Sequence, residues 1–177
     1  MNPKTRLATV WLDGCSGCHM SLLDLDHRVL DFAGAVELVY SPLMDAKEFP
    51  RDVDVVLIEG AVGTDDDLRT LHLIREHSKV LVSLGDCAVT ANVPSMRNRF
   101  DAGAVLGRAY IENADGNAQI PRDDLPALRR RVLPLHQFVK VDVYIPGCPP
   151  PADAIHFALT ELVAGRLPDF GAGSRFG

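Results

Sequence analysis

Four cysteines are the residues of this chain whose type and spacing point most directly to chemistry. Cys15 and Cys18 form a CxxC pair, whereas Cys87 and Cys148 stand alone and far along the 177-residue sequence. Thiolates bind zinc and iron–sulfur clusters, and CxxC pairs also carry thiol–disulfide exchange. Each cysteine has a glycine within two residues, which lets the backbone approach a bulky inorganic group. The cysteines therefore define the candidate site.

The elements that must position these cysteines are short apolar runs alternating with helical patterns. This alternation predicts an α/β fold with a parallel sheet, and strands that are apolar on both faces are typical of a sheet covered by helices on each side. We expect strands at Leu7–Leu12, Val36–Tyr40, Val53–Glu59, Lys79–Leu84 and Val139–Ile145. Helices are expected at about 18–32, 65–77 and 152–164, and one more within the segment 123–137.

The length and composition indicate one domain. The chain is 47% hydrophobic and 24% charged, and its length corresponds to roughly one domain at about 150 residues per domain. We expect residues 1–177 to fold as a single domain with an irregular insertion at about 94–138, where glycines, prolines and other turn-forming residues weaken the pattern. A span of this length without clear elements is usually functional or an interface.

In this strand pattern every cysteine follows the carboxyl end of a strand. Cys15 and Cys18 follow the first strand, Cys87 follows the fourth and Cys148 follows the fifth. In an open parallel sheet the carboxyl ends of the strands lie along one edge, and ligands bind in the crevice outside that edge. The four thiols are therefore expected to converge on one site.

Several kinds of site are compatible with four converging thiols. Free cysteines can simply pack as small hydrophobic residues. A redox pair at Cys15 and Cys18 would leave Cys87 and Cys148 unused. A structural zinc ion takes four thiolates, but zinc modules usually bring two close pairs, whereas here one pair is joined by two distant single cysteines. An iron–sulfur cluster uses all four cysteines and their glycine-rich surroundings, and the residues favour it.

Charge and hydropathy exclude other classes of function. A formal net charge of −6 argues against a general nucleic-acid partner, because affinity for a polyanion depends on lysine and arginine. No apolar stretch approaches the roughly 18 residues of a membrane span. The sequence MNPKTRLATVWLDG at the start has no signal-peptide core, so we expect a cytoplasmic protein. Neither GxGxxG after a strand nor a P-loop pattern is present, which leaves a nucleotide site on this chain unsupported.

A few other polar residues allow both a functional and a structural interpretation. Glu59 ends the third strand and should face the same crevice, where it is a candidate proton relay, a loop cap or a partner for an arginine. His19 follows Cys18 and would either donate to a sulfur or be solvated at a helix start. Arg129–Arg131 are expected on a solvated or subunit-facing helix, and His72 and His77 on an exposed helix face.

Four segments together resemble the small subunit of nickel–iron hydrogenases, most closely the Y subunit of the soluble NAD-reducing enzymes. The segments are WLDGCSGCHMSLLDLD at 11–26, IEGAV at 58–62, LGDCAVTANVPSMRN at 84–98 and IPGCPPPADAI at 145–155. They occur in order from end to end, so the resemblance covers essentially the whole chain. The related subunit of respiratory complex I, which carries the cluster nearest the quinone, has adjacent cysteines at its first ligand position, where this chain has CxxC.

The resemblance implies a flavodoxin-like, doubly wound, three-layer domain with one 4Fe-4S cluster, the proximal cluster. Its ligands would be the matching residues Cys15, Cys18, Cys87 and Cys148. A large subunit would hold the nickel–iron centre, since no cysteine is left over for it here, and diaphorase iron–sulfur and flavin subunits would bring FMN and NAD. The chain would then be the electron-transfer subunit of a hydrogen:NAD+ oxidoreductase. A complex I-like quinone oxidoreductase subunit and a structural four-cysteine zinc module are the alternatives.

Overall fold

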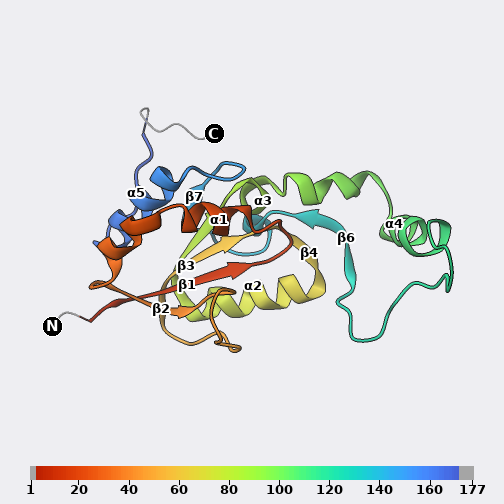
Figure 1. The fold of residues 1–177 in the computed structure, drawn as a ribbon, viewed down its shortest axis with the longest axis horizontal. Helices are drawn as coiled ribbons and strands as arrows, with labels where there is room; N and C mark the ends of the chain where they lie inside the picture. Colours follow the sequence, from red (N-terminus) through yellow and green to blue (C-terminus); the bar gives the residue numbers. More distant parts are fainter. Residues whose placement is uncertain (1–2, 172–177) are drawn as a thin grey trace.

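A five-stranded parallel sheet forms the centre of the computed structural model, which describes residues 3–171 (Figure 1). The order of its strands is β2-β1-β3-β5-β7. This is the doubly wound order of flavodoxin-like folds, in which the strand order reverses between β1 and β3. The strands are β1 (Thr5–Trp11), β2 (Val36–Tyr40), β3 (Val53–Glu59), β5 (Ser78–Leu84) and β7 (Val143–Ile145).

Helices cover both faces of this sheet. Helix α2 (Asp65–His77) packs on one face, and α1 (Gly17–Leu23) and α5 (Ala152–Val163) lie on the other (Figure 1). The short helix α3 (Asp86–Thr90) follows β5 directly. The predicted three-layer, flavodoxin-like α/β fold is confirmed.

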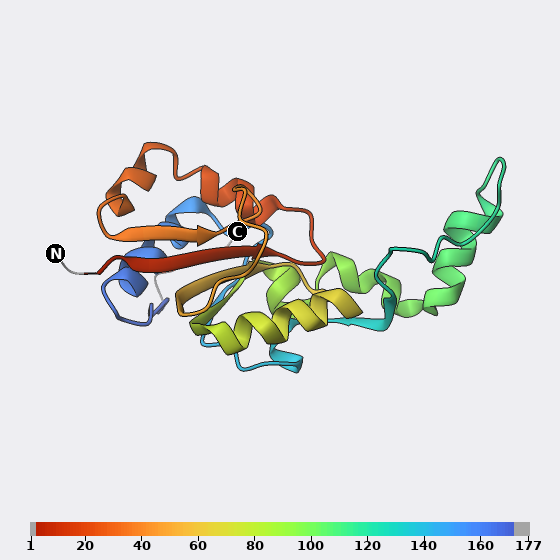
Figure 2. The same ribbon diagram turned by 90° about the horizontal axis from the view of Figure 1, so that it is seen from below.

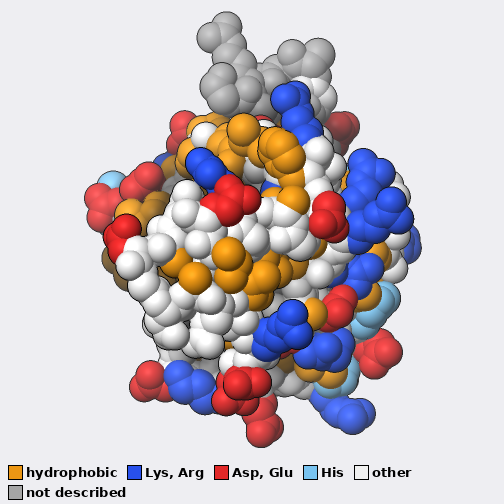
Figure 3. Space-filling view, turned by 90° about the vertical axis from the view of Figure 1, so that its right-hand side faces the viewer, with side chains coloured by type: hydrophobic (Ala, Val, Ile, Leu, Met, Phe, Trp, Pro, Cys, Tyr) orange, Lys and Arg blue, Asp and Glu red, His pale blue; other side chains and the backbone are white. Residues whose placement is uncertain are grey.

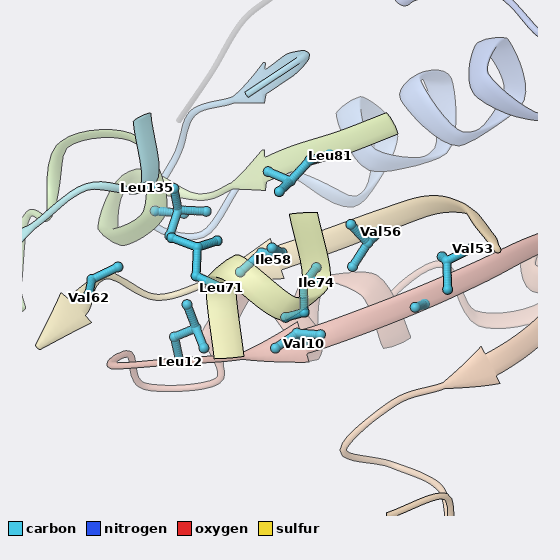
Figure 4. Close-up of a cluster of buried hydrophobic side chains, with 12 residues drawn as sticks. Val10, Leu12, Val53, Val56, Ile58, Val62, Leu71, Ile74, Leu81 and Leu135 are labelled. Carbon is cyan, nitrogen blue, oxygen red and sulfur yellow. The ribbon is translucent and has the colours of Figure 1, made fainter. Parts of the chain in front are cut away.

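The buried strand β3 shows why the sheet needs cover on both faces. Val56 and Ile58 belong to the hydrophobic cluster under α2, which is drawn in Figure 4, whereas Val55 and Leu57 belong to the cluster under α5. Alternate residues of a strand point to opposite faces, so an apolar residue at each position fills both layers of the core. The continuous apolar run in the sequence is the direct consequence.

Helix α2 begins where the sequence predicts it. Thr64 is the N-cap: its hydroxyl accepts a hydrogen bond from the Asp67 N–H at 3.1 Å, and the Asp67 carboxylate accepts one from the Thr64 N–H at 2.8 Å. This reciprocal pair is a capping box. At the other end the expectation for the histidines holds only in part, because His72 is exposed whereas His77 is half-buried and stacks on Phe49.

The single helix expected at 18–32 is wrong. Helix α1 ends at Leu23, and a separate 3-10 helix, η1 (Asp26–Phe32), follows it. Asp26, the first residue of η1, adopts a left-handed backbone conformation with φ of 52°, which an α-helix cannot accommodate. The break lets Leu25 enter the core with 1% of its surface exposed, while η1 itself buries no residue.

The expectation of a helix within 123–137 is also wrong, apart from one short 3-10 turn. The segment contains β6 (Leu128–Leu133), which pairs antiparallel with the short strand β4 (Val62–Thr64), and a 3-10 turn, η4 (Leu135–Gln137). Arg129–Arg131 therefore lie on a strand. Val132 is buried in a small cluster with Ala61 and Ala91, so pairing with β4 places this apolar residue out of contact with water.

The last sheet strand is shorter than the expected Val139–Ile145. Only Val143–Ile145 form β7, and Asp142 connects to the neighbouring strand in a different way. The Asp142 N–H donates to the Leu81 carbonyl at 2.9 Å, while its carboxylate accepts from the Leu81 N–H at 2.9 Å. The Asp142 carboxylate thus takes the place of a backbone carbonyl as the acceptor for β5.

The expected irregular insertion contains helical elements of its own. These are the 3-10 helix η2 (Val93–Arg99), the helix α4 (Ala102–Gly107) and the π-helix η3 (Arg108–Glu112). Residues 100–127, here called the arm, extend away from the carboxyl edge of the sheet (Figures 1 and 2). No helix within residues 3–171 is long and apolar enough to cross a membrane. That residues 1–177 make up a single domain stays a prediction.

Candidate metal centre

The carboxyl ends of four neighbouring strands are level across the sheet. Trp11 of β1 pairs with Glu59 of β3, Glu59 with Leu84 of β5, and Leu84 with Ile145 of β7. The loops that follow these strands therefore start from one line. The crevice between β1 and β3, where the strand order reverses, lies on this line.

All four cysteines lie just beyond this line. Cys15 is in the loop after β1, Cys18 is the second residue of α1, Cys87 is the second residue of α3, and Cys148 is in the loop after β7. Cys18 is buried, Cys87 is half-buried, and Cys15 and Cys148 are exposed. The predicted position of each cysteine at a strand end is confirmed, and the group extends from the core to the surface.

Hydrogen bonds tie the cysteine-bearing segments to one another. The Asp86 N–H, at the start of α3, donates to the Gly147 carbonyl at 2.8 Å, and the Gly147 N–H donates back to the Asp86 carboxylate at 2.7 Å. The buried hydroxyl of Ser21 in α1 donates to the carbonyl of Pro150. Segments from three regions of the sequence are thereby fixed at one edge of the sheet.

Glycine is required at two positions beside these sulfurs. Gly85 has φ of 80°, and a methyl group on it would overlap the Cys18 sulfur. Gly147 has φ of 133°, and a Cβ there would lie 2.6 Å from the Pro150 Cα. Only glycine combines this backbone conformation with the absence of a Cβ. At both positions the space that a side chain would fill next to the cysteines is therefore left open.

The thiols influence one another electrostatically. Burial raises the pKa of Cys18 to about 12, with further contributions from Glu59 and from the other three cysteines. Burial also raises the pKa of Cys87 to about 11, assisted by Cys148 and Cys15. Burial and neighbouring negative charges both disfavour the thiolate form of these side chains.

The residues at this edge fit a group with four cysteine ligands. Four thiols lie within electrostatic reach of one another, and glycine backbone stands where side chains would compete for the space. Among residues 3–171, no three histidine, cysteine, aspartate or glutamate side chains are close enough to hold a single metal ion between them. Iron–sulfur clusters are held by cysteine thiolates, four of them for a 4Fe-4S cluster.

Glu59 and His19 lie together below the cysteines, in an arrangement that the sequence pattern did not indicate. Both are buried, and the Glu59 Oε2 lies 2.7 Å from the His19 backbone N and 2.7 Å from its Nδ1. The partner of Glu59 is thus a histidine and not an arginine. His19 is not solvated, and its other ring nitrogen lies 3.0 Å from the Thr9 hydroxyl. The ring therefore contacts Glu59 and Thr9 in place of the expected sulfur.

Two hydroxyls complete this group, and they too were missed from the sequence. Thr9 and Ser41 are buried, and their side-chain oxygens lie 2.8 Å apart. The available signal was Thr9 itself, a polar residue within the apolar run of the first strand. A buried polar side chain needs a hydrogen-bonding partner, so its position pointed to a second polar residue in the core.

The fold and the site define a class: a flavodoxin-like domain with four cysteines at the carboxyl edge of its sheet. Residues 15–162 match the family model described as "NADH ubiquinone oxidoreductase, 20 Kd subunit". Since the match covers most of the chain, this protein belongs to that family.

Curated relatives are hydrogenase subunits. The NAD-reducing hydrogenase HoxS subunit delta of Cupriavidus necator is 40% identical over 168 residues, which are 92% of this chain and 80% of that protein. A subunit of the vhu F420-non-reducing hydrogenase of Methanocaldococcus jannaschii is 37% identical over 165 residues. The match spans 92% of this chain but only 57% of that relative.

Solved structures agree with the sequence relatives. A chain in the crystal structure of NAD+-reducing [NiFe]-hydrogenase in the H2-reduced state superposes with a TM-score of 0.93 at 37% identity, covering 99% of this chain and 100% of that one. A chain of the [NiFeSe] hydrogenase from Desulfovibrio vulgaris Hildenborough gives a TM-score of 0.58 at 18% identity, with 93% and 64% covered, which shows the shared fold alone. The resemblance to hydrogenase small subunits is confirmed.

Proposed function

We propose that this chain is the electron-transfer small subunit of a cytoplasmic NAD-reducing nickel–iron hydrogenase and holds one 4Fe-4S cluster. The observation that carries the proposal is the set of four thiols, Cys15, Cys18, Cys87 and Cys148, on the level ends of neighbouring strands. A large subunit would hold the nickel–iron centre. Diaphorase iron–sulfur and flavin subunits would hold FMN and bind NAD. The 40% identity to a subunit of an NAD-reducing hydrogenase supports this assignment.

A bound cluster supplies a site that accepts and releases single electrons. The four thiolates hold it, with Cys18 anchoring the group in the core and Cys15 and Cys148 reaching the surface. The glycine backbone at Gly85 and Gly147 makes room for it. Glu59 is the candidate group for holding a proton close to this edge, because its Oε1 would lie 3.4 Å from a Cβ on Gly14, beside Cys15.

The large subunit is placed at the carboxyl edge of the sheet by the same proposal. Several large apolar side chains are exposed along the arm, which extends from that edge: Phe100, Tyr110, Ile111 and Leu125. In the view that faces the arm, hydrophobic side chains gather across the middle of the molecule, and charged side chains lie mainly around them (Figure 3). Large exposed apolar patches mark protein interfaces, so the arm is the expected contact with the large subunit.

A complex I-like quinone-reducing subunit is the second candidate. The description of the matching family as an NADH ubiquinone oxidoreductase subunit favours it. The CxxC pair and the hydrogenase relatives favour the first proposal. The two candidates predict different partners, with membrane subunits in the complex I-like case and a diaphorase in the hydrogenase.

The deciding experiment is purification of the chain with its native partners, followed by metal analysis. The hydrogenase proposal predicts a brown complex that dithionite bleaches, with iron and sulfide bound to this chain and nickel bound to its partner. Replacing Cys87 by serine should remove iron from this chain. A colourless chain with stoichiometric zinc would contradict the cluster, and iron without nickel in a complex with membrane subunits would support the quinone-reducing alternative.

A further inference from the structure

A line of four buried polar side chains runs from the end of β3, through α1 and β1, to the residue that follows the edge strand β2. Glu59, His19, Thr9 and Ser41 are each no more than 3% exposed. Successive contacts measure 2.7 Å from Glu59 Oε2 to His19 Nδ1, 3.0 Å from His19 Nε2 to the Thr9 hydroxyl, and 2.8 Å from Thr9 to Ser41. Burying polar groups is costly unless they are hydrogen-bonded, and each member of this line has its partner in the next.

His19 contacts Glu59 through two separate groups. Its backbone N–H and its ring Nδ1 both lie 2.7 Å from the same carboxylate oxygen, Oε2. A carboxylate accepts hydrogen bonds, so Nδ1 donates to Glu59. The other ring nitrogen, Nε2, contacts the Thr9 hydroxyl, which donates to Ser41. Contacts from two points of one residue fix both the position and the rotation of the Glu59 carboxylate.

The fixed rotation directs the second carboxylate oxygen toward the site. Oε1 faces Gly14, where an added Cβ would lie only 3.4 Å away, and Gly14 directly precedes Cys15. The carboxylate is therefore held where it can act on a group bound by these cysteines.

We propose that His19 is the positioning residue for Glu59, holding its carboxylate turned with Oε1 toward the cysteine edge. This inference rests on the proposed cluster function, because it concerns what the carboxylate does to a cluster bound there. The ring of His19 itself is engaged by Glu59 and Thr9. Its contribution to the cluster is therefore made through Glu59.

Two substitutions of His19 separate its two ring contacts. The side-chain nitrogen of asparagine lies close to the position of Nδ1, and that of glutamine close to the position of Nε2. His19→Asn should thus keep the donor to Glu59 and lose the contact with Thr9, whereas His19→Gln should do the reverse. Glu59→Gln, which removes the carboxylate charge, is the reference variant.

The test uses the purified complex and the cluster's midpoint potential, from a redox titration followed by electron paramagnetic resonance. A nearby negative charge disfavours the reduced cluster, so Glu59→Gln should raise the potential. In His19→Gln the carboxylate loses its ring donor and can turn away from the cysteine edge, so its effect on the cluster weakens and the potential should rise in the same direction. The midpoint potential of His19→Asn should equal that of the wild type. The rate at which the complex exchanges deuterium between hydrogen gas and solvent should also change in Glu59→Gln and His19→Gln and not in His19→Asn. If Glu59 relays protons, this exchange should be slowed on the order of 100-fold in Glu59→Gln.

Each other outcome overturns a different claim. Equal potentials for His19→Asn and His19→Gln, with iron content and melting temperature retained, would show that His19 does not position Glu59. A loss of iron in both variants would reduce His19 to a structural residue and would equally contradict the proposal. Unchanged exchange in Glu59→Gln would refute the proton relay alone, and a wild-type complex without a cluster would refute the proposed function itself.

Discussion

Among single residues, the glycines beside the cysteines matter to the site as much as the sulfurs do. Gly85 follows β5 at the point where the chain turns toward Cys87, and its Cα faces the Cys18 sulfur. The positive φ and the close sulfur impose two separate requirements. A side chain that strains the backbone at this φ lowers the stability of the fold. A side chain that fills the space beside the sulfur changes what the sulfur can bind.

Gly85→Ala should remove the cluster, and Gly165→Ala is its matched control. Both glycines have a positive φ, 80° and 75°, but nothing lies within 4 Å of a Cβ on Gly165. The control should therefore lose only about 1–2 kcal/mol from backbone strain and keep its iron. Iron content and the visible spectrum of the purified complex check this prediction. Equal iron in the two variants would show that the space at Gly85 does not matter.

Among the helices and strands, the predictions from sequence were correct where a segment is stabilised by interactions within itself. Helix α2 has its capping box and its apolar stripe within 13 residues, so its bounds were predicted from the sequence. The segment after α1 failed because the helical pattern continues through Leu25, whereas the burial of that residue in the core requires a break. The segment that forms β6 failed because its partner, β4, lies more than 60 residues earlier in the chain.

Thr64→Ala tests how far α2 depends on its cap. Removing the hydroxyl leaves the Asp67 N–H without its side-chain acceptor, so the free energy of unfolding should fall by about 1 kcal/mol. Thr70→Ala, in the interior of the same helix, is the control, and the better helix propensity of alanine should leave stability equal or slightly higher. Urea unfolding of both variants measures the difference. A cap variant as stable as the control would refute the assigned role.

At the scale of the whole molecule, the arm is the feature that the chain alone does not explain. It extends beyond the sheet edge that carries the cysteines, and its apolar side chains are exposed (Figure 2). A partner docked over that edge would cover both the arm and the four cysteines in a single interface. The two features support the same placement of the large subunit.

Ile111→Asp should therefore weaken association with the large subunit. Burying an unpaired charge in an interface is costly, so we expect affinity to fall more than about tenfold. Leu167→Asp is the control, since Leu167 is also exposed but follows α5, away from the arm (Figure 1). Co-purification and titration calorimetry with the large subunit give the comparison. If Leu167→Asp weakened association as strongly as Ile111→Asp, the arm would not be the interface.

Patterns in the amino-acid sequence were sufficient to predict the layered α/β fold, the strands β1, β2, β3 and β5, and the placement of Cys15, Cys18, Cys87 and Cys148 at strand ends. These follow from periodicity and from the geometry of parallel sheets, which are properties of short segments. Only the tertiary structure decided the pairing of His19 with Glu59, the strand β6 and the arm. Each depends on contacts between segments distant along the chain, which no local pattern encodes. The four cysteines could be predicted to converge, but the group that surrounds and orients the carboxylate below them becomes visible only after folding.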